Sequence, residues 1–158
     1  MIKIIAVGKI KEKYLRDGIN EYAKRLGAYT KVSIVEVSDE RIPDNASAAQ
    51  EDIVKVKEGQ KLLKQIKERD YVILLDVGGK MMDSVAFSKT IEQLQLTGHS
   101  DIDFVIGGSL GHCQDVYQRA DLRLSFSPMT LPHQLMRLVL MEQIYRGYKI
   151  MRHETYHK

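Results

Sequence analysis

The sequence predicts an α/β fold, with a largely parallel sheet flanked by helices. Short runs rich in Val, Ile and Leu recur along the 158 residues, and segments of helical length separate them. Parallel strands need such crossover segments, and continuous apolar runs are typical of strands that are buried on both faces. The length is that of one domain, so we expect a single domain over residues 1–158.

Two pairs of strand and helix are expected in the first half of the chain. Residues 2–8 (IKIIAVG) and 32–37 (VSIVEV) are rich in β-branched residues and predict strands. Residues 12–26 carry apolar side chains at helical spacing and predict a helix. A longer helix is expected from Ser47, although Gly59 in its interior costs about 1 kcal/mol relative to Ala.

The same alternation continues after residue 70. Residues 71–77 (YVILLDV) predict a strand, and the glycines and lysine at 78–80 predict a turn. Asp83 or Ser84 is a suitable N-cap for a helix over residues 85–96. These residues form a third pair of strand and helix.

The last third of the chain contains two further strands and two helices. Residues 101–106 (DIDFVI) predict a strand, residues 113–120 a short helix, and residues 122–127 (LRLSFS) another strand. Pro132 is expected as the first residue of a final helix that ends near Arg152, because proline is well suited to that position.

The final helix is apolar around most of its circumference. Residues 138–141 (LVLM) are four consecutive apolar residues. The residues that widen this stripe further are Leu135, Ile144, Tyr145 and Tyr148. A central buried helix would explain the stripe, and so would burial against both the sheet and a second subunit. We favour the second explanation and expect a homodimer.

The net charge of +3 resides in the C-terminal segment. Residues 133–158 hold five basic and two acidic residues, and the rest of the chain is neutral by count. The single cysteine, Cys113, has no partner for an internal disulfide, and no apolar stretch is long enough to span a membrane. We therefore expect a cytoplasmic protein that does not reside in a membrane.

A glycine-rich loop at residues 107–111 (GGSLG) follows a predicted strand, where backbones approach ligands closely. It matches neither of the common nucleotide-binding glycine motifs. It does match G-x-S-x-G, so an alternative is a serine hydrolase in which Ser109 is the nucleophile, with Asp115 or Asp121 and then His133. Only about three predicted strands precede the one that leads into the loop, which is few for that architecture.

No metal site is expected from the histidines or the cysteine. His153 and His157 are four residues apart near the terminus, but no cysteine or pair of carboxylates accompanies them. Cys113 follows His112, yet a small buried residue is the more economical explanation for it than a reactive thiol.

Longer motifs carry more information than these short patterns. The most extensive are FVIGGSLG at residues 104–111 and LSFSPMTLPHQLMRLVLMEQIYRGYKI at 124–150, before a terminus that reads YHK. IKIIAVGKIKEKY at residues 2–14, KEGQ at 57–60 and LDVGGK at 75–80 agree with them. In these motifs the chain resembles, from end to end, the bacterial 23S ribosomal RNA (pseudouridine-N3)-methyltransferases, which are small members of the SPOUT superfamily.

The resemblance implies a trefoil knot in the C-terminal part of the sheet, an exception to the rule that chains do not thread through loops. It also implies that S-adenosylmethionine binds in the knot as methyl donor, without a metal. The positions that match the family's cofactor-binding segments are Leu75, Gly107, Phe126, Ser127, Pro128, Met129, Thr130 and Leu131.

For catalysis, the resemblance points to the C-terminal residues. His157 or His133 is expected to accept the N3 proton of pseudouridine, and Arg152 or Arg137 to stabilise the negative charge on the base. Tyr156 is expected to stack on the target nucleotide. We expect the tail that holds Tyr156 and His157 to complete the site of the other subunit in a homodimer.

The substrate that the resemblance implies is 23S rRNA in the assembled ribosome. A chain without a separate RNA-binding domain would then recognise its target chiefly by shape, with phosphate contacts from Lys9, Lys11, Lys13 and Arg16. A non-catalytic RNA-binding module is the other alternative to the enzyme.

Overall fold

The computed structural model describes all residues, 1–158, and confirms the predicted α/β class. The strands are Ile2–Val7 (β1), Val32–Val37 (β2), Tyr71–Met81 (β3), Ile102–Ile106 (β4) and Leu122–Ser125 (β5). The helices are Lys13–Leu26 (α1), Ala48–Leu63 (α2), Ser84–Leu96 (α3), Gln114–Arg119 (α4) and His133–Met151 (α5). None of these helices combines the length and the apolar character that a membrane crossing requires.

The five strands form one sheet in the order β2-β1-β4-β3-β5, and every neighbouring pair is parallel. Ile2 of β1 is in register with Val32 of β2 on one side and Ile102 of β4 on the other. The central strands β1 and β4 are almost fully buried, as the continuous apolar runs predict. Because all strands are parallel, their carboxyl ends lie at the same edge of the sheet.

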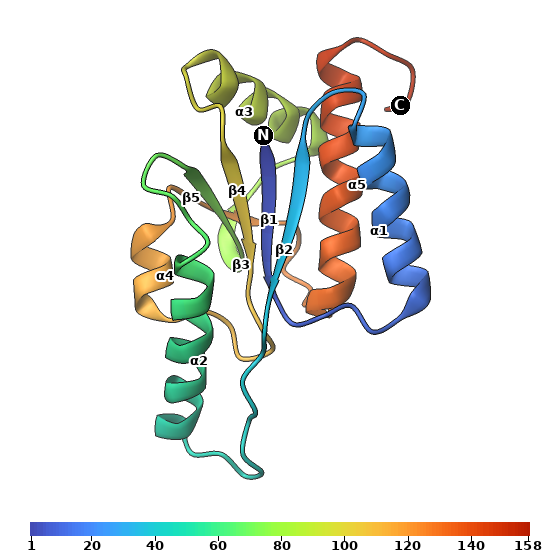
Figure 1. Cartoon of the computed structure of the whole chain (residues 1–158). Coiled ribbons are helices and arrows are strands. Elements are labelled where there is room, and N and C mark those ends of the chain that lie inside the picture. The colour runs from blue at the N-terminus through green and yellow to red at the C-terminus, as the bar shows by residue number, and fades with distance from the viewer.

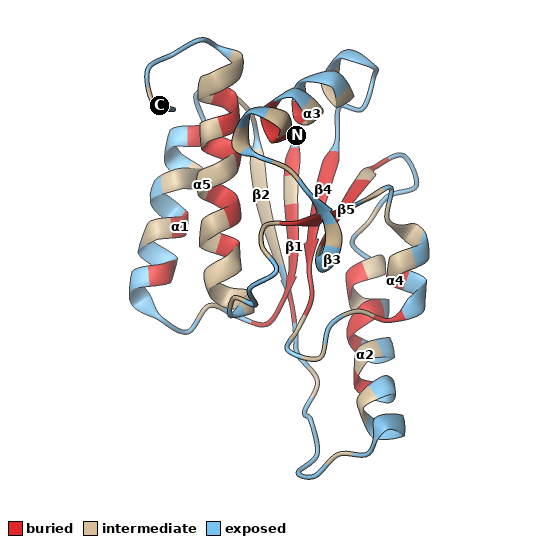
Figure 2. Ribbon diagram, turned by 180° about the vertical axis from the view of Figure 1, so that it is seen from behind, coloured by how far each residue is buried: buried red, intermediate tan, exposed pale blue.

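Helices cover both faces of the sheet (Figure 1). Helices α1, α3 and α5 share a core with one face, where Ile19, Ile91 and Ile144 are buried. Helices α2 and α4 cover the other face through residues such as Leu62 and Val116. The buried residues lie along the strands and the inner sides of the helices (Figure 2).

Helix α5 packs against both α1 and α3, and its buried residues share one core with the strands. Its residues Leu140, Met141 and Ile144 are fully buried within the single chain. The wide apolar stripe of this helix is thus largely covered by its own subunit, while Leu135, Leu138 and Val139 stay partly exposed. The predicted homodimer remains a prediction.

Two of the helices begin at strong N-caps. Ser47 and Gln50 form a capping box at the start of α2, because each side chain bonds to the backbone N–H of the other. Of the two candidates before α3, Asp83 is the cap, and its carboxylate accepts a hydrogen bond of 2.7 Å from the Ala86 N–H. Pro132 directly precedes α5 instead of being its first residue.

The turn predicted at residues 78–80 is wrong, because β3 continues as far as Met81. After an irregularity beyond Leu75, Lys80 and Met81 pair with Leu124 and Ser125 of β5. At Gly79 a Cβ atom would lie 2.7 Å from the carbonyl carbon of Arg123, so only glycine permits this crossing. Strand β5 ends at Ser125, two residues earlier than predicted.

The interior glycine of α2 has a packing role. A Cβ on Gly59 would overlap the Sγ atom of Cys113 and lie 3.1 Å from a methyl group of Val116. The missing side chain lets α2 approach the start of α4 closely, and this offsets the low helix propensity of glycine.

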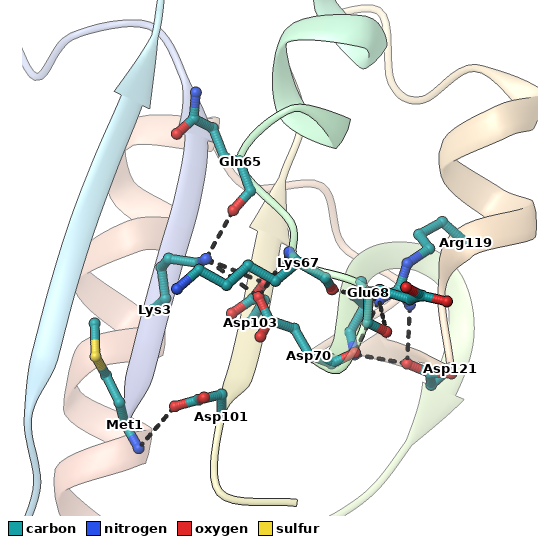
Figure 3. A network of polar contacts seen from close by, with 11 residues as sticks. Met1, Lys3, Gln65, Lys67, Glu68, Asp70, Asp101, Asp103, Arg119 and Asp121 are labelled. Carbon is teal, nitrogen blue, oxygen red and sulfur yellow. Dashed lines mark hydrogen bonds and ion pairs between the residues drawn. The ribbon is translucent and has the colours of Figure 1, made fainter.

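A buried polar cluster lies at the edge of the sheet where the strands begin, opposite to their carboxyl ends (Figure 3). The Lys3 ammonium donates a hydrogen bond of 3.2 Å to the Asp70 carboxylate and lies 3.6 Å from the Asp103 carboxylate. Burial, followed by the hydrogen bond with Asp70, raises the pKa of Asp103 to about 7. The cluster ties β1, β3 and β4 together at the end of the sheet that faces away from the glycine loop.

Candidate functional site

A cavity of about 530 Å³ lies beyond the carboxyl ends of the strands. Its wall is formed by the ends of β3, β4 and β5, the glycine loop, and the segment that leads into α5. Apolar side chains and backbone groups make up most of the lining. Ligands of open parallel sheets bind at this edge, and the size suits a small organic molecule.

The glycine loop follows β4 directly and forms one wall of the cavity. A Cβ at Gly107 would lie 2.6 Å from Cε1 of His112, and Gly111 has a left-handed φ of +92°. Both positions therefore need glycine, the first for space and the second for backbone conformation. The loop presents its backbone, and not bulky side chains, to the cavity.

His112 connects the glycine loop to the end of β3. Its Nε2 lies 3.0 Å from the carbonyl oxygen of Leu75. A carbonyl only accepts hydrogen bonds, so Nε2 carries the hydrogen and Nδ1 the lone pair. Burial lowers the pKa of His112, which keeps the ring neutral. His112 was not among the predicted site residues, although it directly follows the glycine loop in the sequence.

Asp76 is the only carboxylate in the cavity lining. The Arg123 guanidinium holds it through an Nε to Oδ2 hydrogen bond of 3.1 Å, and also lies over the ring of Tyr117 at 4.7 Å. Asp76 was missed as a site residue, although it directly follows Leu75 in the LDVGGK motif. It places one negative charge at the cavity wall.

The segment after β5 lines the cavity. The Ser127 hydroxyl accepts a hydrogen bond of 2.9 Å from the Met129 N–H, which forms a tight turn. Phe126 packs edge-on against Phe87 of α3, with 6.4 Å between ring centroids. The predicted cofactor-binding residues in this cavity lining are Leu75, Gly107, Phe126, Ser127, Met129, Thr130 and Leu131. Pro128 is the one predicted position outside the lining.

His133 lines the same cavity from the first turn of α5. Burial, and then the positive charge of Arg137, lower the pKa of His133. The imidazole is therefore neutral near pH 7 and able to accept a proton. Of the residues predicted to act in catalysis, His133 alone lies at the cavity wall of its own chain.

Arg137 is one turn further along α5 but does not line the cavity. Its side chain is only 1% exposed, and Nη1 donates a hydrogen bond of 2.6 Å to the Glu36 carboxylate. Nη2 donates to the Gly8 carbonyl oxygen at 3.1 Å. Arg137 thus joins α5 to the carboxyl ends of β1 and β2, and this structural placement gives its predicted catalytic role no support.

The C-terminal tail leaves α5 at Met151 and folds back along the second half of the helix. Tyr156 there donates a hydrogen bond of 3.2 Å to Glu142, nine positions beyond His133, which corresponds to about 14 Å along a helix. Tyr156 packs edge-on against Tyr145, with 4.9 Å between ring centroids. The Arg152 guanidinium lies 5.4 Å from the centroid of Tyr29. Within one chain, Arg152, Tyr156 and His157 therefore do not meet His133.

The catalytic triad of a serine hydrolase is not assembled. Ser109 and His133 both line the cavity, but Ser109 makes no hydrogen bond to any side chain. Asp121 precedes β5, at the amino-terminal edge of the sheet, where its carboxylate accepts a hydrogen bond of 2.8 Å from the Val72 N–H. It cannot orient His133 at the opposite edge.

The fold and the site together define a class of protein. A parallel sheet in which the end of β3 crosses β5 backbone to backbone, with a cavity beside that crossing, is the arrangement expected of a SPOUT methyltransferase. Residues 1–157 match the family model described as "Predicted SPOUT methyltransferase", and the chain belongs to this family. The family uses S-adenosylmethionine as methyl donor and has a trefoil knot.

Closely similar proteins carry a more specific name. The chain is 55% identical over 157 residues to "Ribosomal RNA large subunit methyltransferase H" of Clostridium kluyveri, covering 99% of both proteins. Proteins of the same name from Alkaliphilus oremlandii and Clostridium botulinum strain Hall are 56% identical, with the same coverage. The similarity thus extends over the whole chain.

The residues present fit S-adenosylmethionine. The cofactor has a flat adenine, a polar amino-acid end and a positive sulfonium. The cavity has an apolar wall that includes Ile106 and Met136, the exposed backbone of the glycine loop, and the Asp76 carboxylate. Its volume lies within the range of about 300–1,000 Å³ that is usual for such ligands.

Proposed function

We propose that this protein methylates N3 of a pseudouridine in 23S rRNA within the assembled ribosome, and that it acts as a homodimer of single-domain chains. The observation that best supports the substrate is the identity of 55% over the full chain to proteins named as methyltransferases of large-subunit ribosomal RNA. The cavity at the carboxyl edge of the sheet supports the cofactor.

The protein has two chemical tasks in this reaction. Bound S-adenosylmethionine, held by the residues that line the cavity, would supply the methyl group for N3, and the electron pair of the carbon–sulfur bond would remain on sulfur. The hydrogen on N3 must leave as a proton, and the neutral His133 imidazole at the cavity wall is placed to accept it. The remaining task is to hold the base in line with the methyl group.

The position of the tail supports a dimeric site. The tail folds back along α5, where Tyr156 contacts Glu142 and His157 contacts Arg146. These two helix residues are nine and thirteen positions beyond His133, or about 14 and 20 Å along the helix. We propose that the two tail residues reach the cavity of the partner subunit, where Tyr156 stacks on the target nucleotide and Arg152 stabilises negative charge on it. The partly exposed Leu135 and Leu138 on α5 offer apolar surface for the contact between subunits.

Basic residues near the cavity offer contacts for the RNA backbone. Lys9, Lys11, Lys13 and Arg16 are all exposed, in or just after the loop that follows β1. The Lys11 N–H donates a hydrogen bond of 3.2 Å to the side chain of Gln134, next to His133. This places the basic loop beside the end of α5 that lines the cavity, where a bound RNA strand would need positive charge.

The decisive test is methyl transfer to ribosomes. Radiolabelled S-adenosylmethionine and 70S ribosomes from a strain that lacks the modification are incubated with the protein, and the nucleosides are analysed by mass spectrometry. We expect N3-methylated pseudouridine from 23S rRNA, and no product from naked 23S rRNA. Tight cofactor binding without any methyl transfer would instead favour the non-catalytic RNA-binding module.

A further inference from the structure

Glu142, in the middle of α5, and Arg146, one turn later, form an ion pair. The Glu142 Oε1 atom accepts hydrogen bonds from Nε and Nη2 of Arg146, at 2.9 and 2.6 Å. Both side chains are three-quarters buried or more, so the pair is shielded from solvent on most sides. A two-point contact of this kind fixes the plane of the guanidinium.

This pair contacts both of the tail residues that we assign to the reaction. The Tyr156 hydroxyl donates a hydrogen bond of 3.2 Å to Glu142 Oε1, and burial raises the pKa of Tyr156 to about 12, which keeps that hydroxyl protonated. The Arg146 guanidinium lies over the Tyr156 ring at 4.7 Å. The same guanidinium reaches His157, with 3.1 Å between Nη1 and Nδ1.

The contact with Arg146 determines the tautomer of His157. A guanidinium has only N–H donors, so His157 Nδ1 must use its lone pair as the acceptor. The single ring hydrogen of the neutral imidazole is then on Nε2. In this state the ring has a free donor at Nε2 and no free lone pair that could take up a proton.

We propose that Arg146, held by Glu142, is a positioning residue that fixes His157 as the Nε2–H tautomer, so that His157 donates a hydrogen bond to the substrate base instead of accepting its proton. This inference rests on the proposed function. Loss of the N3 proton leaves negative charge on the neighbouring carbonyl oxygens of the base, and a preorganised donor stabilises that charge. Proton uptake is then left to His133.

Nitrogen NMR on the full-length protein tests the tautomer directly. In protein labelled at histidine with ¹⁵N, we expect the His157 ring to show a protonated Nε2 and an unprotonated Nδ1 at neutral pH. In Arg146→Met the donor is lost, and we expect the ring to become a mixture of tautomers. A wild-type His157 that is already a mixture, or has its hydrogen on Nδ1, would overturn the proposal.

Arg25→Met is a matched control for this measurement. Arg25 also pairs with a glutamate one turn away, Glu21, and also lies over the ring of Tyr145, but it does not contact His157. We expect its removal to leave the His157 signals unchanged. If Arg25→Met changes the tautomer as much as Arg146→Met does, the effect is a general one and the proposed role of Arg146 is wrong.

Activity gives an independent readout. A glutamine side chain places an amide N–H donor close to the position of Nε2 and has no basic nitrogen. We expect His157→Gln to keep kcat within about tenfold of wild type and His157→Ala to lose about 100-fold, the usual effect of removing one such donor. Arg146→Met should lower kcat with little change in the KM for ribosomes. Suppose that His157→Gln is as inactive as His157→Ala, although the wild-type ring is in the Nε2–H form. Donation of a hydrogen bond is then not the role of His157.

The two hypotheses can fail separately. If the wild-type protein does not methylate ribosomes, the proposed function fails, whereas the NMR spectra still report whether Arg146 fixes the tautomer. If ribosomes are methylated but the ring of His157 is not held in the Nε2–H form, only the inference about Arg146 fails.

Discussion

Arg137 on α5 and Glu36 on β2 are 101 residues apart in the chain and form a hydrogen-bonded ion pair of 2.6 Å. Together with the bond from Arg137 to the Gly8 carbonyl oxygen, this pair fastens the helix behind the cavity to the carboxyl ends of two strands. The side chain of Arg137 is almost fully enclosed, so its charge depends on these partners.

We predict that Arg137→Ala is strongly destabilising. Removal of the guanidinium leaves a cavity and deprives the Gly8 carbonyl of its hydrogen-bond donor, whereas Glu36 is 35% exposed and keeps its bond from the Ile10 N–H. We expect a loss of about 2–5 kcal/mol, which is usual for a large-to-small substitution at a buried position. Urea unfolding followed by circular dichroism measures the change. Arg25→Ala, which removes an exposed pair with Glu21, serves as the control and should shift the unfolding midpoint little. Equal effects of the two substitutions would contradict the structural role of Arg137.

Gly107→Val should weaken the binding of S-adenosylmethionine severely without unfolding the chain. The added side chain would start 2.6 Å from His112 and push that ring, or the glycine loop, into the cavity. Isothermal titration calorimetry measures the affinity, and circular dichroism reports the fold. Gly147→Ala is a suitable control, because its Cβ would meet Ser88 at an ordinary distance of 3.7 Å. Wild-type affinity in Gly107→Val would argue against cofactor binding in this cavity.

The stability of the protein should depend on the titration of Asp103. Its pKa is about 7 in the folded chain, above the ordinary value of 3.8, so folding favours the protonated form. The resulting stabilisation is complete below about pH 4 and is lost as the pH rises to 7, with a slope of up to about 1.4 kcal/mol per pH unit.

Asp103→Asn provides the comparison, because asparagine resembles the protonated acid and does not titrate. We expect the free energy of unfolding of the variant, relative to wild type, to rise between pH 5 and pH 8. Urea unfolding at a series of pH values measures this difference. A difference that stays constant over the range would show that Asp103 does not titrate there.

Deletion of residues 156–158 should abolish methyl transfer and leave cofactor binding nearly intact. The cavity contains none of these residues, so the affinity measured by calorimetry has no reason to change. Transfer to 70S ribosomes, in contrast, needs the tail in the partner subunit according to our proposal. Mixing the truncated chain with a chain that carries Gly107→Val should restore part of the activity, since one of the two composite sites would then be whole. Full activity of the truncated protein alone would refute the role of the tail.

Much of the site could be predicted from sequence because its parts are contiguous motifs. The run from Phe126 to Leu131 and the glycine at 107 were selected from motifs, and the structure places nearly all of them around one cavity. Asp76 and His112 were missed because their importance comes from the partners Arg123 and Leu75, which are far away in sequence. Arg137 was selected for its charge, but its burial is visible only in three dimensions.

The sequence by itself determined the class of fold, the approximate place of every strand and helix, and membership of a methyltransferase family. These features depend on local propensity, on hydrophobic periodicity and on motifs that are continuous along the chain. Only the tertiary structure decided that β3 runs through Gly79 to Met81, because that extension depends on pairing with β5, more than 40 residues later. It also decided that His157 folds back onto Arg146, thirteen positions beyond His133 on α5, or about 20 Å along the helix. This separation follows from the rigid geometry of α5 and the path of the tail, and not from the types of residue.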